Sequence, residues 1–247
     1  MRKVFSSFLK YVPIILFWLL VWEAANFFVE SNIIIVSPRA AFTRLFQLGQ
    51  TLEFWGSIAT SLGRIMQGFF MALGAGIIIA AISARFKLFH RLVLPAVNVI
   101  NAIPIASFTI IALMAMDSAS LPVFVAFVTV LPIVFYNTYK GIESTDAALL
   151  EMADTFKVPV WKKILYIYFK TVWPFVLSAA NVGIGFAWKS GIAAELIGVV
   201  RGTIGASLHT ARIFLLTADV FAWTIAIVLL SYAMEKLFRI IFGRVMK

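Results

Sequence analysis

The sequence contains no cysteine, which excludes disulfides, thiolate metal sites and cysteine nucleophiles. Its two histidines, His90 and His209, lie far apart, and neither has a companion at metal-ligand spacing, so we interpret both as structural. No phosphate-binding loop of the form GxxxxGKS/T occurs, and no Ser-His-Asp arrangement is evident. We therefore predict no catalytic residue, no metal site and no cofactor held by this chain.

Charged residues are also scarce: they make up 13% of the 247 residues, whereas hydrophobic residues make up 62%. A soluble domain has roughly a quarter charged residues, so this chain would expose too much apolar surface in water. We predict an all-α membrane protein with one domain, residues 1–247. In a soluble chain a net charge of +10 would suggest a nucleic-acid partner. Here the bilayer is the expected partner, because basic residues orient membrane proteins, and we expect no nucleic acid.

Six segments are long and apolar enough to cross a bilayer, which takes about 20 residues. The first follows Arg2, Lys3 and Lys10 in the charge order of a signal peptide, but it runs on without a clear cleavage site, so we expect an uncleaved membrane helix. Glycines in the fifth segment, at positions 183, 185, 191 and 198, indicate a broken span. The six predicted spans are Tyr11–Val29, Trp55–Ser83, Leu92–Met116, Leu121–Tyr139, Val172–Val200 and Leu215–Met234.

The basic residues predict the orientation of these spans. With the N-terminus inside, fifteen of them fall in cytoplasmic segments and only four outside, at Arg39, Arg44, Arg201 and Arg212. This distribution follows the positive-inside rule and predicts that both termini are cytoplasmic. The polar segment Ser31–Thr51 then lies outside, where Ser37-Pro38 predicts the start of a short surface helix that ends near Gln50.

Two spans carry a small residue at every fourth position, which predicts faces of close helix packing, because lipid offers no hydrophobic drive for helix association. These rows say which faces are buried and nothing about a solute. The first row is Ala72, Gly76, Ala80 and Ala84, and the second is Ala179, Gly183, Ala187 and Gly191.

The 31-residue cytoplasmic segment Lys140–Lys170 is the long connection between spans. Its first half can begin a helix at Ser144 or Thr145, and Pro159 separates it from a second helix. We predict a helix-turn-helix on the membrane surface; the pattern alone equally favours a pair of helices that only joins two spans. The apolar positions at helical spacing are Leu149, Met152, Ala153 and Phe156, then Trp161, Ile164, Leu165 and Tyr168.

The residues of this segment resemble a known family. Glu151-Met-Ala-Asp-Thr-Phe-Lys157-Val-Pro-Val-Trp161 is similar to the "EAA" loop of the permeases of binding-protein-dependent ABC importers. The likeness extends from Ser37 to Phe242. It includes Ser57–Gly68, Asn101-Ala-Ile-Pro104 and Thr145–Glu151. The most specific match is Ala187-Trp-Lys189-Ser-Gly-Ile-Ala-Ala194-Glu195, which points to the nitrate, sulfonate and taurine branch.

This resemblance implies a MetI-like permease fold of six transmembrane helices in a bacterial inner membrane. It implies that the 140–170 loop binds a groove of a separate cytoplasmic ATPase, which holds the ATP and magnesium. The expected partners are two copies of that ATPase, a second permease copy in a homodimer, and an external binding protein. The solute stays open among nitrate, sulfonates, taurine, and vitamins or their precursors. The ATPase-coupling residues implied are Leu149, Glu151, Met152, Ala153, Phe156, Lys157 and Trp161.

The loop also departs from the family pattern. The family's glycine falls at Lys157, and its later Leu-Pro falls at Phe169-Lys170. A lysine is disfavoured in the left-handed backbone conformation that glycine adopts freely. Either the turn is made differently, for example by Pro159, or the ATPase partner is specialised.

Charged residues within the predicted spans are candidates for the translocation path, because a charge inside a bilayer is costly. We assign Arg64, Trp188, Lys189 and Glu195 to this path. Arg64 and Glu195 could instead form a buried bridge between helices. Our hypothesis is that Arg64 and Lys189 make the path electropositive and favour small polar or anionic solutes. The alternative function is an ion-coupled secondary transporter or a channel without an ATPase, for which Glu23 and Glu195 are the candidate carboxylates.

Overall fold

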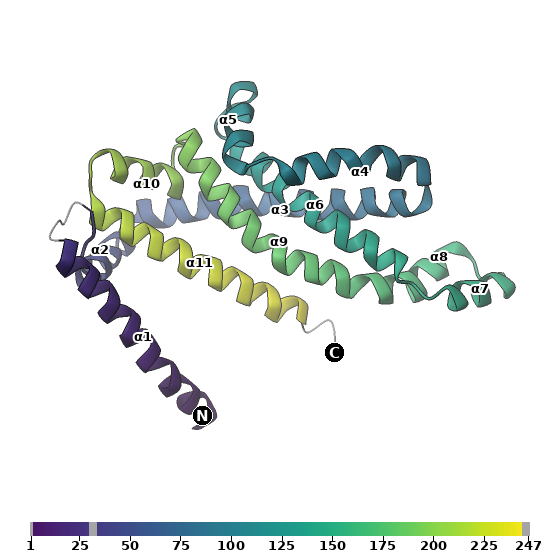
Figure 1. The fold of residues 1–247 in the computed structure, drawn as a ribbon, viewed down its shortest axis with the longest axis horizontal. Helices are drawn as coiled ribbons and strands as arrows, with labels where there is room; N and C mark the ends of the chain where they lie inside the picture. Colours follow the sequence, from purple (N-terminus) through teal and green to yellow (C-terminus); the bar gives the residue numbers. More distant parts are fainter. Residues whose placement is uncertain (1, 30–33, 244–247) are drawn as a thin grey trace.

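The computed structural model describes residues 2–29 and 34–243, with side chains at 12–29 and 34–240. This part of the chain is helical throughout, apart from short turns (Figure 1). The helices are α1 (Arg2–Val29), α2 (Pro38–Gly49), α3 (Leu52–Arg85), α4 (Lys87–Ala102), α5 (Ile105–Ala115), α6 (Leu121–Glu143), α7 (Ala147–Thr155), α8 (Val160–Lys163), the π-helical turn η1 (Ile164–Tyr168), α9 (Phe169–Gly198), α10 (Ile204–Ile213) and α11 (Thr217–Gly243).

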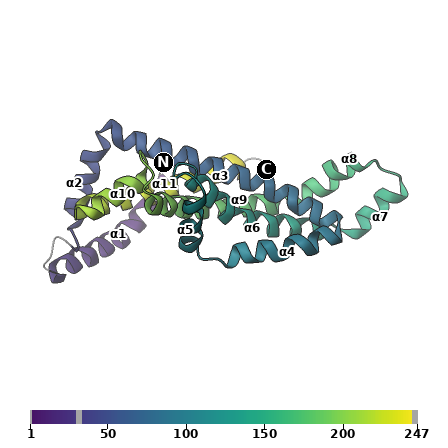
Figure 2. The same ribbon diagram turned by 90° about the horizontal axis from the view of Figure 1, so that it is seen from above.

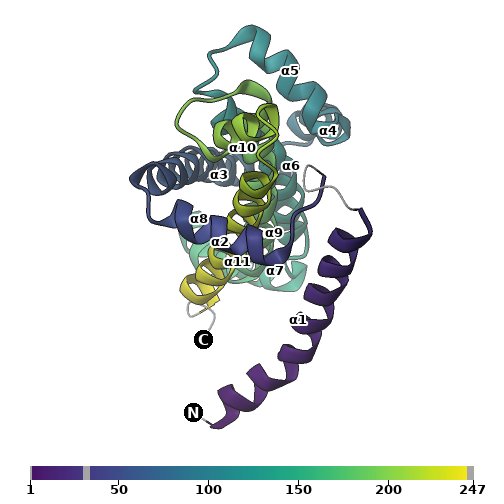
Figure 3. The ribbon, with the colours of Figure 1, turned by 90° about the vertical axis from the view of Figure 1, so that its left-hand side faces the viewer.

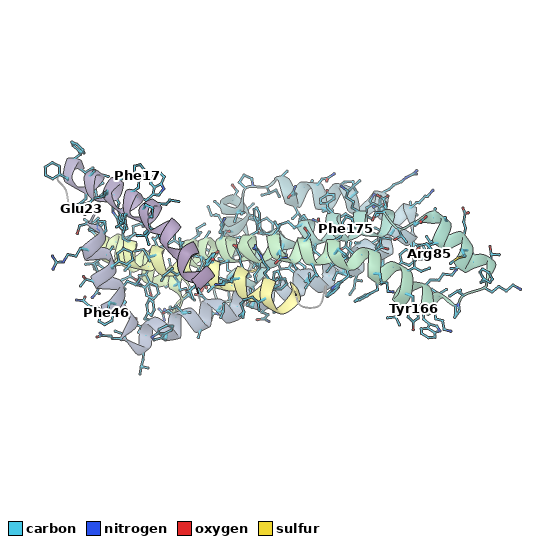
Figure 4. All side chains as sticks on the ribbon, turned by 90° about the horizontal axis from the view of Figure 1, so that it is seen from below. Phe17, Glu23, Phe46, Arg85, Tyr166 and Phe175 are labelled. Atoms are coloured by element: carbon cyan, nitrogen blue, oxygen red, sulfur yellow. The ribbon has the colours of Figure 1, made fainter. Side chains whose placement is uncertain are left out.

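The long helices run along one axis, and the short helices gather at the two ends (Figures 1 and 2). Helices α2 and α10 lie at one end, and α7 and α8 lie at the other. Arg85, at the end of α3, marks the α7–α8 end, and Phe46 on α2 marks the opposite end (Figure 4). We refer to these as the cytoplasmic and outer ends, following the predicted orientation.

The spans match the six predicted segments, with corrections to the third and the fifth. Among the described residues, five helices are long and apolar enough to cross a membrane, and α4 with α5 makes a sixth if that bent pair is one span. The predicted third span is not straight: α4 and α5 meet at 105°. Proline lacks an N–H and forces the preceding residue out of helical geometry. Ile103, before Pro104, accordingly has an extended backbone (φ −74°, ψ 129°).

The predicted break in the fifth span is wrong, because α9 is continuous from Phe169 to Gly198. Its glycines are packing positions. A Cβ on Gly183 would lie 3.1 Å from Val130 Cγ1, and one on Gly191 would lie 2.8 Å from Ile65 Cδ1. The absence of a side chain at these positions lets α6 and α3 approach the backbone of α9.

The centre of the bundle is α6, which packs against α3 on one side and α9 on the other. The two small-residue rows lie on these contact faces and are buried, apart from partly buried Ala84. On α3, a Cβ at Gly76 would lie only 2.8 Å from the Val134 side chain of α6. The apolar core therefore forms around α6, with Phe69 and Phe135 fully buried in it.

The outer end is held by polar contacts. The Ser37 hydroxyl accepts a hydrogen bond from the Ala40 amide (3.2 Å) and caps α2, as predicted. The Arg44 guanidinium binds both carboxylate oxygens of Asp219, with Nη2 at 3.0 Å from Oδ2, and this hydrogen bonding raises the pKa of Arg44 above its ordinary value. The bond joins α2 to the first turn of α11. By contrast, most of α1 stands away from the bundle (Figure 3); it contacts α2, and its Trp22 ring stacks on Phe221 of α11 with 5.5 Å between the centroids.

Two neighbouring glycines of α3 test how much the bundle depends on close packing. We expect Gly76→Leu to lower the free energy of unfolding by about 1–3 kcal/mol, because the new side chain overlaps Val134. Gly74→Leu is the matched control, since nothing lies within 4 Å of a Cβ at that position. Unfolding of the purified chain in detergent measures both. Equal loss of stability in the two variants would contradict this account.

Candidate functional site

The cytoplasmic loop begins where α6 ends at Glu143. The predicted cap at Ser144 or Thr145 is wrong: the N-cap is Asp146, whose carboxylate accepts a hydrogen bond from the Ala148 amide (2.9 Å). The Ser144 hydroxyl is already used, because it donates to the Gly141 carbonyl (2.9 Å) in the last turn of α6. Helix α7 therefore starts at Ala147 and ends at Thr155.

The second helix of the loop is not a separate element. Pro159 precedes α8, as predicted, but α8 continues through η1 directly into α9. The predicted boundary near Lys170 is absent because residues 161–173 contain no proline or glycine that would end a helix. Residues 160–198 consequently form one continuous span that extends beyond the bundle at the cytoplasmic end (Figure 2).

The turn between α7 and α8 is built on Lys157, which adopts a left-handed backbone (φ 49°). Its amide donates to the Asp154 carbonyl (2.9 Å), and the Val158 amide donates to the Ala153 carbonyl (2.8 Å). This pair of bonds is the usual way a helix ends at a glycine. The suggestion that Pro159 makes a different turn is therefore wrong. An ion pair between Lys163 and Asp154 joins α8 to α7 across it.

Most of the predicted coupling residues are exposed on this loop. Leu149, Met152 and Phe156 share one side of α7, which we call the loop face, and the Phe156 side chain is 76% exposed. Apolar groups exposed together at a protein's end mark an interaction surface. Trp161 is 60% exposed on α8, Glu151 and Lys157 are exposed as well, and Ala153 is buried.

Of the predicted path residues, Lys189 is the one that lies on an open face. It shares an exposed strip of α9 with Val182 and Phe186, at positions i, i+4 and i+7. Val182 and Phe186 line a cavity of about 260 Å³ between α9, α6 and the α4–α5 bend, which also contains Asn101 and Thr129. Trp188 is buried, and its indole N–H donates to the Ile227 carbonyl of α11 (3.1 Å).

Glu195 is fully buried where α9, α3 and α10 meet. Its Oε2 accepts hydrogen bonds from the Ser61 hydroxyl (2.8 Å) and from the Gly205 amide (3.1 Å). The alternative of a direct Arg64–Glu195 bridge is not formed: the ion pairs among the described side chains are Arg44–Asp219 and Lys163–Asp154. The structure brings Glu195 close to α10 and leaves Lys189 on a different side of α9.

Ser61, Gly205 and a second cavity were not predicted from the sequence. Ser61 lies one turn from Arg64, and this serine beside an intramembrane charge was the available signal. The second cavity, of about 720 Å³, lies at the outer end between α2, the start of α3, and α10. No sequence pattern marked it, because its wall depends on how α10 folds back against α3.

The fold defines the class of the protein: a polytopic helical membrane protein with exposed apolar side chains on the loop at one end. The chain belongs to the family described as binding-protein-dependent transport system inner membrane component, which matches residues 72–247. It is therefore a multi-pass inner-membrane permease of a binding-protein-dependent ABC importer. Such a system includes a separate ATPase and a binding protein, and the permease is the transport component without a catalytic domain.

Named relatives are distant. The chain is 24% identical to SsuC from Bacillus subtilis, a permease protein named for aliphatic sulfonates transport, over 89% of this chain and 79% of the relative. It is 27% identical to the nitrate import permease NrtB from Synechococcus elongatus, over 62% of this chain and 55% of that relative. It is 20% identical to the taurine transport permease TauC from Escherichia coli, over 87% of this chain and 80% of that relative.

A solved structure shows the same fold. It is the crystal structure of a bacterial ABC transporter involved in the import of the acidic polysaccharide alginate, with a TM-score of 0.67 and 13% identity. The likeness covers 100% of this chain and 98% of that chain. These comparisons confirm the predicted family and its all-helical fold.

The left-handed turn yields a test of local strain. We expect Lys157→Gly to raise the free energy of unfolding by about 1 kcal/mol, because glycine adopts this conformation without a Cβ clash. Lys162→Gly, the same substitution within α8, should instead lower it by about 1 kcal/mol. Unfolding in detergent measures both changes. A loss of stability in Lys157→Gly would contradict the claim that the backbone at Lys157 is strained.

Proposed function

We propose that the 140–170 loop of this domain, residues 1–247, binds the ATPase and that α9 lines a path for a small anionic solute. One observation carries the path: Lys189 is a cation exposed within a membrane span, beside a partly polar cavity. A lysine facing hydrocarbon is costly, whereas one facing water or a second protein chain is not. The exposed strip of α9 therefore contacts the solute or a second subunit and does not face lipid.

The loop face is proposed as the ATPase contact. Phe156, Met152 and Leu149 are exposed on α7 and at its C-terminal end, which lies beyond the bundle (Figure 2). Glu151 and Lys157 flank them with charges of both signs, and Trp161 adds an exposed aromatic ring. Exposed aromatic anchors of this kind carry much of the energy of a protein interface. Ala153, being buried, supports the turn from within.

Phe156→Ala tests this contact. We expect the affinity for the ATPase to fall about 30-fold or more, the effect of losing an interface anchor worth about 2 kcal/mol. Phe46→Ala is the matched control: that ring is similarly exposed, at 71%, but lies at the outer end (Figure 4). Binding of the purified ATPase to the permease in lipid nanodiscs measures both.

Glu151→Ala should likewise uncouple transport or prevent assembly. A fully active importer carrying this substitution would count against the proposed contact, as would equal effects of Phe156→Ala and Phe46→Ala.

A second copy of this chain is proposed to complete the path. The cavity between α9, α6 and the α4–α5 bend is open on one side, so it needs a facing surface to enclose a solute. Two copies would place two Lys189 side chains along one path, with two ATPases at the cytoplasmic end. The mass of the assembled importer tests this, and a single permease copy per complex would refute it.

An anionic solute agrees with the names of the relatives, which include nitrate, aliphatic sulfonates and bicarbonate. The electrostatics favour it independently, because Lys189 has no ion-pair partner among the described side chains and would attract a negative charge. Arg64, Trp188 and Glu195 stay in the proposed path region, where their buried atoms support the wall formed by α9 and α3.

Removing the charge of Lys189 tests the path. We expect Lys189→Met to lower uptake of the anionic solute at least tenfold, since the solute loses its counter-charge in the membrane. Lys170→Met is the control, because that lysine lies at the cytoplasmic end of α9. Uptake by cells carrying the whole importer is measured, together with the Arg64→Met/Lys189→Met variant. Unchanged uptake in that double variant would refute an electropositive path.

A further inference from the structure

The short helix α10 forms a wall of the outer cavity and is attached at both ends by unusual backbone. Ala206, Ser207 and Thr210 of α10 line the cavity opposite Gly56 and Thr60 of α3. The residue after α9, Val199, and the residue after the α10 cap, Leu215, both adopt left-handed conformations (φ 47° and 53°). Such backbone is rare and strained for a β-branched or bulky residue. Other contacts must therefore hold α10 in place against the strain at these two positions.

The N-terminus of α10 is held by side chains from two other helices. The Gly205 amide donates to Glu195 of α9 (3.1 Å), and the Ile204 amide donates to the Ser61 hydroxyl of α3 (3.0 Å). Ser61 in turn donates to Glu195 Oε2 (2.8 Å), so the three helices share one hydrogen-bonded cluster. The contact is close, because a Cβ on Gly205 would overlap the backbone of α9 at Leu196. A carboxylate at a helix N-terminus is also favoured by the helix dipole.

A second potential partner for Glu195 is Arg64, which lies on α3 one turn after Ser61. Glu195 Oε1 is buried and has no hydrogen-bond partner among the described residues, and the same holds for Arg64 Nη1. Arg64 follows Ser61 by three residues and is half-buried on the same helix. A buried charge without its partner is costly, so the pair would gain free energy by meeting. In this conformation Glu195 is instead held towards α10.

We propose that Glu195 and Ser61 are positioning residues that latch α10 across the outer cavity, and that Arg64 receives Glu195 when α10 moves during transport. In the latched state Glu195 binds the N-terminus of α10, and release would relax the strain at Val199 and Leu215. In the released state the Arg64–Glu195 ion pair replaces the lost hydrogen bonds. Glu195 thus makes different contacts in two states, as a switch between them requires.

Thiol labelling tests the latch, and the chain suits it because it contains no cysteine. Ala211→Cys reports on α10, because Ala211 lines the cavity and is buried in the latched state, at 3% exposed. Gly56→Cys is the reporter on α3, exposed in the same cavity, where a Cβ meets nothing within 4 Å. The assembled importer in lipid nanodiscs is labelled with a bulky polar maleimide, with and without Ser61→Ala. We expect Ser61→Ala to speed labelling of Ala211→Cys about tenfold, the factor for about 1.4 kcal/mol of lost hydrogen bonding. Labelling of Gly56→Cys should not change.

Glu195→Gln should speed labelling of Ala211→Cys in the same way. Unchanged labelling of Ala211→Cys in both variants would overturn the latch. An equal rise at Gly56→Cys would overturn it too, because it would show a general change in access to the cavity and not a movement of α10.

The role of Arg64 is tested by trapping the importer with ATP and vanadate. We expect trapping to speed labelling of Ala211→Cys in the otherwise unchanged chain, and Arg64→Met to abolish that increase while leaving the nucleotide-free rate unaltered. Arg64→Lys, which keeps the positive charge, should retain part of the increase. Absence of any change on trapping, or an Arg64→Met variant that still responds fully, would overturn the proposed second state.

Discussion

Helices in a bilayer gain little by hiding apolar side chains from lipid, so their association depends on close van der Waals contact and on a few polar bonds. In this protein the close contact is made by α6, which fits against the small-residue rows of α3 and α9. Everything at the two ends is attached to these three helices. The cytoplasmic loop joins α6 to α9, and the outer cavity is formed by the opposite ends of α3 and α9 together with α10. The packing of the three helices thus fixes the separation and orientation of both ends.

The continuity of α8, η1 and α9 connects those ends mechanically. Within residues 160–198, Trp161 beside the loop face and Glu195 beside α10 are about 51 Å apart at 1.5 Å per residue. A loop attached by a flexible linker could move without affecting the bundle, whereas a loop that is the end of a packed helix cannot. Under the proposed coupling, a displacement of α7 and α8 by the ATPase would rotate or shift α9. Ser61 and Arg64 lie on the neighbouring helix α3, so such a shift of α9 would change the position of Glu195 relative to both of them.

The sequence predicted the spans, the packing faces and the family, because these depend on periodicity, composition and local motifs. It failed where tertiary contact decides. Gly183 and Gly191 were predicted as members of a packing row, which is confirmed, but also as helix breakers, which is wrong: in α9 they are contact points for Val130 and Ile65. Pro104 was recognised, yet the 105° bend depends on α5 finding a place against α6 and α9. Glu195 was placed in the membrane, but its partner Gly205 lies ten residues later on a helix that folds back, a return that no local pattern reveals.

Lys157 shows what a departure from a family motif can and cannot change. The left-handed backbone and the two hydrogen bonds that end α7 are kept with a lysine where relatives of this loop have glycine. The turn is therefore determined by its surroundings: buried Ala153 beneath it and the Asp154–Lys163 pair across it. The Lys163 side chain is 15% exposed and that of Asp154 is 72% exposed, so water screens the pair in part, and it supports the turn together with buried Ala153. What a partner meets at this position is the same backbone with an added, exposed cation. The departure is thus a change in the chemistry of the surface and not in its shape.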